Sequence, residues 1–198
     1  RTLKQKMSAK DLQQKYMKEY LIRMLYVEML GHDASFGHIN AVNMVSSRNL
    51  LEKRIGYLAV SLVLHPEHQL MILLVNAFQT DLKSDNYLEV CMALHAVTKL
   101  CNVDFIPAVM PHVLTLLNHK QAIVRKKAVV CLQRFYSLQP SSISGLNDLI
   151  LKALCDPDPS VMAAALLVLK EVVPSATAEY KMIIPSLVTI LKQIIEHR

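Results

Sequence analysis

Apolar residues recur at steps of three and four along most of the chain, which is the spacing of one face of an α-helix. The clearest case is the stretch 50–64, where Leu51, Ile55, Leu58 and Leu62 step by four, three and four residues. No segment sustains the alternation of apolar and polar residues that is typical of a strand. The pattern therefore predicts an all-α chain, with helices at 7–30, 36–46, 50–64, 67–83, 86–101, 104–118, 121–137, 142–155, 159–173 and 177–197.

Local signals add detail to the first two helices. Gly31 is expected to end the first helix, because glycine readily adopts the left-handed conformation that closes helices. Ser35 is a candidate cap for the second. Leu21, Leu25 and Met29 share one face of the first helix, with Ile22 beside it.

The helical pattern also repeats. Four apolar anchors, Ile55, Val90, Val124 and Val161, are 35, 34 and 37 residues apart. Further apolar residues follow each anchor at plus four and plus seven, and the last three anchors also at plus eleven. One helical hairpin cannot bury its apolar face alone, so this period predicts hairpins stacked into a solenoid.

Two of the units partly match the HEAT repeat, in which a proline in the first helix precedes a turn aspartate and a Val-Arg pair in the second. Pro111 and Val124-Arg125 fit this pattern, with His119 in place of the aspartate. In the next unit Asp156 and Val161 fit, while the proline and the basic residue are replaced. We therefore predict a right-handed α-solenoid of HEAT/armadillo-like helical hairpins, forming a single segment over residues 1–198.

Composition narrows the class of protein. Hydrophobic residues make up 53% and charged residues 19%, which excludes a disordered segment. No apolar run reaches the roughly 18 residues that a membrane span requires, so we expect a soluble chain. The four glycines form no Gly-rich phosphate loop. The start at Arg1 and the end inside a predicted helix indicate a piece of a longer protein.

The net charge of +6 favours an acidic partner or an anionic membrane surface. Nucleic acid is not expected, because the few aromatic residues do not interleave with the basic ones. The candidate contacts are five basic residues: Lys15, Lys18, Arg125, Lys126 and Lys127. The cluster at 125–127, together with Arg134, has two interpretations. It is either a surface for acidic partners or lipid head groups, or a solvated face and ladder to the acidic turns of adjacent repeats. Glu52-Lys53-Arg54 allows the same two.

The four cysteines, at 91, 101, 131 and 155, are widely spaced and form no CxxC motif. We expect small buried hydrophobes in a reducing compartment, with no disulfide framework or zinc site.

Three other groups could suggest chemistry, and each has a plainer interpretation. His65-Pro66-Glu67-His68 could hold a metal, but Pro66 favours a junction between helices and no third ligand is near. Cys91 and His95 are four residues apart, yet a packed cysteine beside a hydrogen-bonded histidine explains them. In His32-Asp33 the aspartate is expected to close the turn after Gly31. We therefore expect no metal, no cofactor and no enzymatic activity.

Several blocks of the chain resemble a known family. They are YLIRMLYVEML at 20–30, GHDASFGH at 31–38, LEKRIGYL at 51–58 and EVCMAL at 89–94. Their order and separation resemble the trunk of the large adaptins of heterotetrameric vesicle-coat adaptors, in the alpha, gamma, delta and epsilon class. Within this class, these blocks together with VRKKAV at 124–129, KALCD at 152–156 and VTILKQ at 188–193 are most similar to the epsilon-adaptins of the fourth adaptor complex.

The resemblance implies a segment, near the N-terminus, of a longer adaptin trunk that takes part in cargo sorting. It implies a beta-type large subunit, a mu subunit and a sigma subunit as partners, and recruitment by an Arf-family GTPase. The implied location is cytoplasmic and peripheral, on trans-Golgi network or endosomal membranes. The lysine triplet that binds phosphoinositide in the alpha member aligns with Met17, Lys18 and Glu19, so only Lys18 carries over.

Two alternatives stay open. The chain could be an autonomous module that binds anionic lipid through the five basic residues named above. It could also be another HEAT-type scaffold, such as a nuclear-import transport receptor, although the FGH and KRIGYL blocks argue against this.

Overall fold

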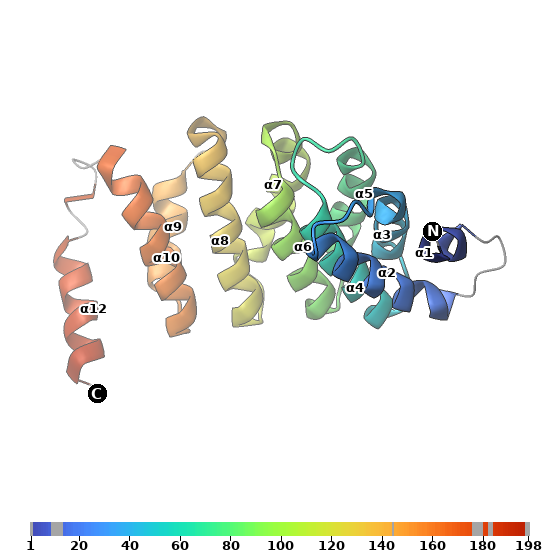
Figure 1. Cartoon of the computed structure of the whole chain (residues 1–198). Helices are drawn as coiled ribbons and strands as arrows, with labels where there is room; N and C mark the ends of the chain where they lie inside the picture. The colour runs from blue at the N-terminus through green and yellow to red at the C-terminus, as the bar shows by residue number, and fades with distance from the viewer. Residues whose placement is uncertain (1, 9–13, 144, 176–179, 182–183, 197–198) are drawn as a thin grey trace.

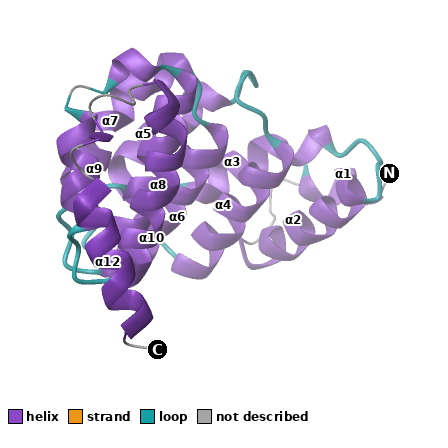
Figure 2. Ribbon diagram, turned by 90° about the vertical axis from the view of Figure 1, so that its left-hand side faces the viewer, coloured by secondary structure: helices purple, strands orange, loops and turns teal. Residues whose placement is uncertain are grey.

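The structure is a computed structural model that describes residues 2–8, 14–143, 145–175, 180–181 and 184–196. Within these residues the regular structure is helical, and no strand occurs (Figure 2). The α-helices are α1 (Thr2–Met7), α2 (Gln14–Met29), α3 (His38–Val45), α4 (Leu50–Val63), α5 (Met71–Asp81), α6 (Tyr87–Leu100), α7 (Ile106–Leu116), α8 (Ala122–Leu138), α9 (Leu146–Leu154), α10 (Pro159–Val172) and α12 (Ile184–Glu196). Short 3₁₀ turns lie at η1 (Ser35–Gly37), η2 (Val103–Phe105), η3 (Pro140–Ser142) and η4 (Val173–Ser175).

The helices stack as hairpins. α3 packs on α4, α5 on α6, α7 on α8 and α9 on α10. Along the stack, α4, α6, α8 and α10 touch in succession and form one row, with α2 against α4, while α3, α5 and α7 form a second row. Figure 1 shows this progression from the N-terminus at one end of the molecule to the C-terminus at the other. The predicted all-α solenoid of helical hairpins is confirmed, and its right-handed turn stays a prediction.

The core lies between the two rows, where the sequence repeat places it. The anchors Val90, Val124 and Val161 are all buried. The apolar residues at plus four, plus seven and plus eleven from each of them are buried too. Each unit leaves its hairpin incompletely covered until the next one packs against it, which is the stabilising principle of a solenoid.

The register predicted for the first unit is confirmed only in part. In α4 the core positions are held by Lys53, Tyr57 and Val60. Of the predicted positions, the anchor Ile55 is partly buried and Ala59, four residues later, is fully buried. The leucines of the predicted face point to solvent instead, since Leu51, Leu58 and Leu62 are 60%, 53% and 49% exposed. α4 is apolar on two sides, and periodicity alone does not distinguish the side that packs inward.

Two predictions at the ends of α2 are resolved. Gly31 does close this helix: it has φ +85°, its N–H donates to the Glu28 carbonyl, and the His32 N–H donates to the Val27 carbonyl. This pair of bonds is the Schellman arrangement, which requires a left-handed residue. Met7, predicted to begin the same helix, is instead the last residue of α1.

The buried stripe of α2 also differs in part from the prediction. Leu21 and Leu25 are buried as expected, but Met29 is 75% exposed and Met24 is buried instead. Ser35 is not a cap. It begins η1, and no side chain caps η1 or α3. Asp33 closes the turn as predicted, because its Oδ1 accepts a hydrogen bond from the Ser35 N–H at 2.9 Å.

Other helix ends shift where local hydrogen bonds compete with the helix. α5 begins at Met71 rather than at 67, because the ring of His68 accepts from the Leu70 N–H at 3.1 Å and forms a turn there. α9 begins at Leu146, directly after Gly145 in the left-handed region. The helix predicted at 177–197 falls partly outside the described residues, and α12 covers Ile184–Glu196 of it. None of the described helices is long and apolar enough to span a bilayer.

Candidate interaction surface

The turns that lead into α4, α6, α8 and α10 share one construction. A polar side chain accepts a hydrogen bond from the backbone N–H two residues later, at 2.9–3.2 Å. The acceptors are Ser47, Ser84, His119 and Asp156. His119 therefore fills the role of the missing HEAT aspartate, using its Nδ1 atom. These turns repeat along the molecule and fix where each helix of the row begins.

Arg125 joins two of these turns. Its guanidinium donates to both carboxylate oxygens of Asp156, in the following repeat, at 2.6 and 2.7 Å, and to the His119 carbonyl at 2.8 Å. The hydrogen bond from Arg125 holds the pKa of the Asp156 carboxyl below its ordinary value. Such planar bidentate pairing is the strongest form of ion pair. Arg125 thus makes the ladder that was one of its two predicted roles.

Lys53 makes an analogous connection deeper in the protein. Its ammonium lies 2.6 Å from Asp81 at the end of α5 and 3.4 Å from Glu89 in α6. The Tyr57 hydroxyl donates to the other Asp81 oxygen at 2.6 Å. Burial, followed by the bond to Asp81, raises the pKa of the Tyr57 hydroxyl. The charge is tolerated in the core because it is paired and hydrogen-bonded.

The predicted basic contacts do not form one patch. Lys126 and Lys127 are half-buried on α8, and neither has an ion-pair partner within the described chain. Lys18 is half-buried on α2, and Lys15 lies in α2 with its side chain outside the described part. α4 and α6 stand between α2 and α8 in the row. Contact of these residues with lipid or an acidic partner stays a prediction.

The histidines of the 65–68 segment, between α4 and α5, contact one another through their rings. The rings of His65 and His68 meet edge to face, with centroids 5.4 Å apart, and His38 meets His68 at 5.7 Å. Burial, followed by the charges of His38 and His65, lowers the pKa of His68. Among the residues that the structure describes, no group of three or more His, Cys, Asp or Glu is placed to hold a metal ion.

The four cysteines are free and differ in environment. Cys101 and Cys131 are buried as predicted, and burial raises the pKa of the Cys101 thiol to about 12. Cys91 is half-buried. The prediction is wrong for Cys155, which is exposed at the end of α9.

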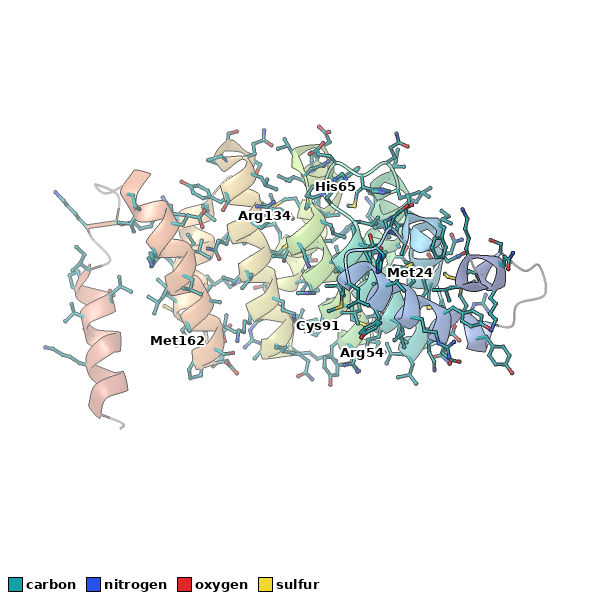
Figure 3. All side chains as sticks on the ribbon, viewed as in Figure 1. Met24, Arg54, His65, Cys91, Arg134 and Met162 are labelled. Carbon is teal, nitrogen blue, oxygen red and sulfur yellow. The ribbon has the colours of Figure 1, made fainter. Side chains whose placement is uncertain are left out.

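A groove of about 740 Å³ lies across α4, α6 and α8. Its apolar lining includes the exposed Leu51 and Leu58 of α4 and Leu88 of α6. Arg54 and Cys91 also line it, and Figure 3 shows them close together near one edge of the stack. An accessible groove lined by leucines is typical of a surface that another chain covers.

Polar groups are few in this groove. They include the side chains of Arg54, Ser61, His95 and Lys127, while the Tyr57 hydroxyl is bonded to Asp81. Ser61 Oγ is buried and has no hydrogen-bond partner in the described part of the chain. Partial burial, followed by the charges of Lys127 and Lys99, lowers the pKa of His95. Sequence reasoning missed the groove, although the second apolar side of α4 was its visible signal.

Comparisons with known proteins agree with this architecture. The AP-4 complex subunit epsilon of Arabidopsis thaliana is 52% identical over 196 residues, which cover 99% of this chain and 21% of the relative. The AP-4 complex subunit epsilon-1 of Mus musculus is 46% identical over 194 residues, covering 98% of this chain and 17% of the relative. The chain thus spans about a fifth of the length of these relatives.

Structural similarity leads to the same group of proteins. A structure described as a homology model of the full-length AP-3 complex in an intermediate open conformation has a TM-score of 0.75 to this chain. The match is 26% identical and covers 91% of this chain and 32% of that one. All of residues 1–198 match the family described as the adaptin N terminal region. The chain therefore belongs to the adaptin N-terminal family.

Proposed function

We propose that this chain is part of a structural subunit of a vesicle-coat adaptor complex, which sorts cargo for intracellular transport by binding other proteins. The observation that carries the proposal is 52% identity to an AP-4 epsilon subunit over 99% of the chain. The leucine-lined groove supports it, because it offers apolar surface that a partner would bury. The proposed role is binding and not catalysis.

The proposed partners are the sibling subunits of such a complex, namely a beta-type large subunit, a mu subunit and a sigma subunit. An Arf-family GTPase is a further proposed partner, and the proposed location is the cytoplasmic surface of trans-Golgi network or endosomal membranes. We also propose that the solenoid is a single segment of a longer trunk, since its relatives are several times longer.

Co-expression with the sigma subunit of the fourth adaptor complex tests this proposal. The tagged chain should retain sigma through purification. Leu58→Asp with Leu88→Asp should abolish retention, because both leucines line the groove. Leu167→Asp is the matched control, since Leu167 is 56% exposed on α10 and does not line the groove. A folded wild-type chain that never retains sigma would contradict the proposal.

Membrane contact through basic residues is proposed separately. Lys126 and Lys127 support it, because neither is used in an ion pair within the described chain. The fraction of protein that sediments with phosphatidylserine liposomes should be smaller for Lys126→Glu/Lys127→Glu than for the wild type. An equal fraction for the variant and the wild type would contradict membrane contact through these lysines.

A further inference from the structure

The charges that line the groove on α4, α6 and α8 have one sign. Arg54 projects from α4 and Lys127 from α8, and no aspartate or glutamate lines the groove. Neither cation has an ion-pair partner among the residues that the structure describes. A low-polarity groove that carries only cations attracts an anionic partner, because field lines concentrate in such a cleft.

The nearby carboxylates are directed into the turns and do not neutralise these cations. Glu52 accepts a hydrogen bond from Ser47 at 2.7 Å. Glu89 accepts one from Ser84 at 2.8 Å and lies 3.4 Å from Lys53. The positive character of the groove is thus a consequence of how each repeat closes its own turn.

The backbone of the groove indicates the form of its occupant. All three lining helices satisfy their own main-chain hydrogen bonds, so the groove offers no strand edge to which an extended segment could pair. The few polar side chains in the lining would leave most N–H and C=O groups of an extended occupant unpaired. A helix satisfies these groups internally and presents apolar side chains at the spacing of Leu51 and Leu58, two turns apart.

We infer that the groove binds an amphipathic helix with leucine-like residues on one face and carboxylates along its flanks, which pair with Arg54 and Lys127. The inference rests on the proposed function only for the identity of the subunit that would supply this helix. The chemistry of recognition is carried by this chain's own residues.

Two synthetic peptides test the inference on the chain as it stands. Both are amphipathic helices with the same leucine face, one with glutamate and one with lysine on its flanks. Fluorescence anisotropy should show the glutamate peptide binding about tenfold more tightly than the lysine peptide at low salt, with the preference shrinking as salt rises. Equal affinities would overturn the inference.

Charge reversal locates the contact. Arg54→Glu/Lys127→Glu should weaken binding of the glutamate peptide about tenfold, so that the lysine peptide then binds more tightly. Arg54→Gln/Lys127→Gln should abolish the preference for the glutamate peptide. This neutral variant replaces the charge reversal if the reversal disturbs folding. Lys126→Glu/Lys170→Glu changes the net charge equally outside the groove lining and should leave the preference intact. Loss of the preference in that control pair alone would overturn the assignment to the groove.

The peptide assay separates this inference from the proposed function. Retention of sigma without a preference for the glutamate peptide would overturn the inference and leave the adaptor proposal standing. A preference for the glutamate peptide without retention of sigma would support the inference and count against the adaptor proposal.

Discussion

Gly56 of α4 lies against the backbone of α3, and no side chain fits there. A Cβ atom at this position would be 2.6 Å from the Val45 backbone nitrogen and 2.7 Å from the Met44 carbonyl carbon. Backbone atoms cannot move aside as the end of a flexible side chain can. The glycine in the KRIGYL block is therefore explained by helix packing, within the fold and independent of any partner.

Comparison of Gly56→Ala with Gly31→Ala tests this explanation. Gly31 has φ +85° but no atom within 4 Å of the added Cβ, so alanine there meets only backbone strain of about 1 kcal/mol. Gly56→Ala must separate two helices and should lower the free energy of unfolding by at least about 2 kcal/mol. Urea unfolding followed by circular dichroism measures both. If both variants lose the same free energy of unfolding, then α3 and α4 can move apart at little energetic cost.

The Arg125–Asp156 pair should make stability depend on pH. Arg125 lowers the pKa of Asp156 below the ordinary aspartate value of 3.8, so the folded state favours the carboxylate. Its contribution is then fully present above pH 3.8 and is lost as the pH falls through the lowered pKa.

Urea unfolding at a series of pH values would measure this dependence. Asp156→Asn should be less stable than the wild type near neutral pH, and the difference should narrow below pH 3.8. Asp85→Asn, an exposed aspartate in another turn, is the control. A difference that stays constant across the acid range would mean that ionisation of Asp156 is not what stabilises the turn.

At the level of the helix, the repeat pattern and the helix positions were readable from the sequence, but the inward side of α4 was not. Val90, Val124 and Val161 each lie on the buried face of their helices, so the repeat identified the core there. In α4 the face that carries the leucines is more apolar than the core face, because the core face contains Lys53, Gly56 and Ser61. Lys53 can be buried only because Asp81, 28 residues later, pairs with it, and that pairing is tertiary information.

The turn before α8 shows how one position can be filled by different residues. Asp156 and His119 accept the same kind of bond from the N–H two residues later, at 2.9 and 3.0 Å. We predict that His119→Asp preserves or increases stability, because a carboxylate also interacts favourably with the start of α8. His119→Ala should lower the unfolding free energy by about 1 kcal/mol.

Thermal unfolding of the two His119 variants would measure the effect, with the exposed neighbour Lys120→Ala as control. The melting temperature of His119→Asp should equal or exceed that of the wild type, and His119→Ala should have the lowest value of the three. A lower value for aspartate than for alanine would mean that the turn depends on the imidazole ring itself.

At the scale of the whole molecule, the two rows bury a continuous core and still leave large apolar side chains in solvent. The groove and the predicted face of α4 overlap, since Leu51 and Leu58 belong to both. The pattern that first suggested a core helix therefore describes an exposed apolar surface. The sequence identified these residues as an apolar face of α4 but not as an exposed one, because apolar periodicity does not tell which of two apolar faces the fold buries.

This surplus of apolar surface should make the isolated chain associate with itself. Sedimentation velocity should show a sedimentation coefficient that rises with protein concentration. Leu58→Gln/Leu62→Gln should reduce the rise without loss of helix content, because both leucines are about half exposed and contribute little to folding.

Leu94→Gln separates surface from core. Leu94 is fully buried in α6, so a polar amide there should lower helix content and increase aggregation. If Leu58→Gln/Leu62→Gln unfolds the chain as Leu94→Gln does, then the leucines of α4 contribute to folding. A chain that stays monomeric at all concentrations would show that its exposed leucines do not drive self-association.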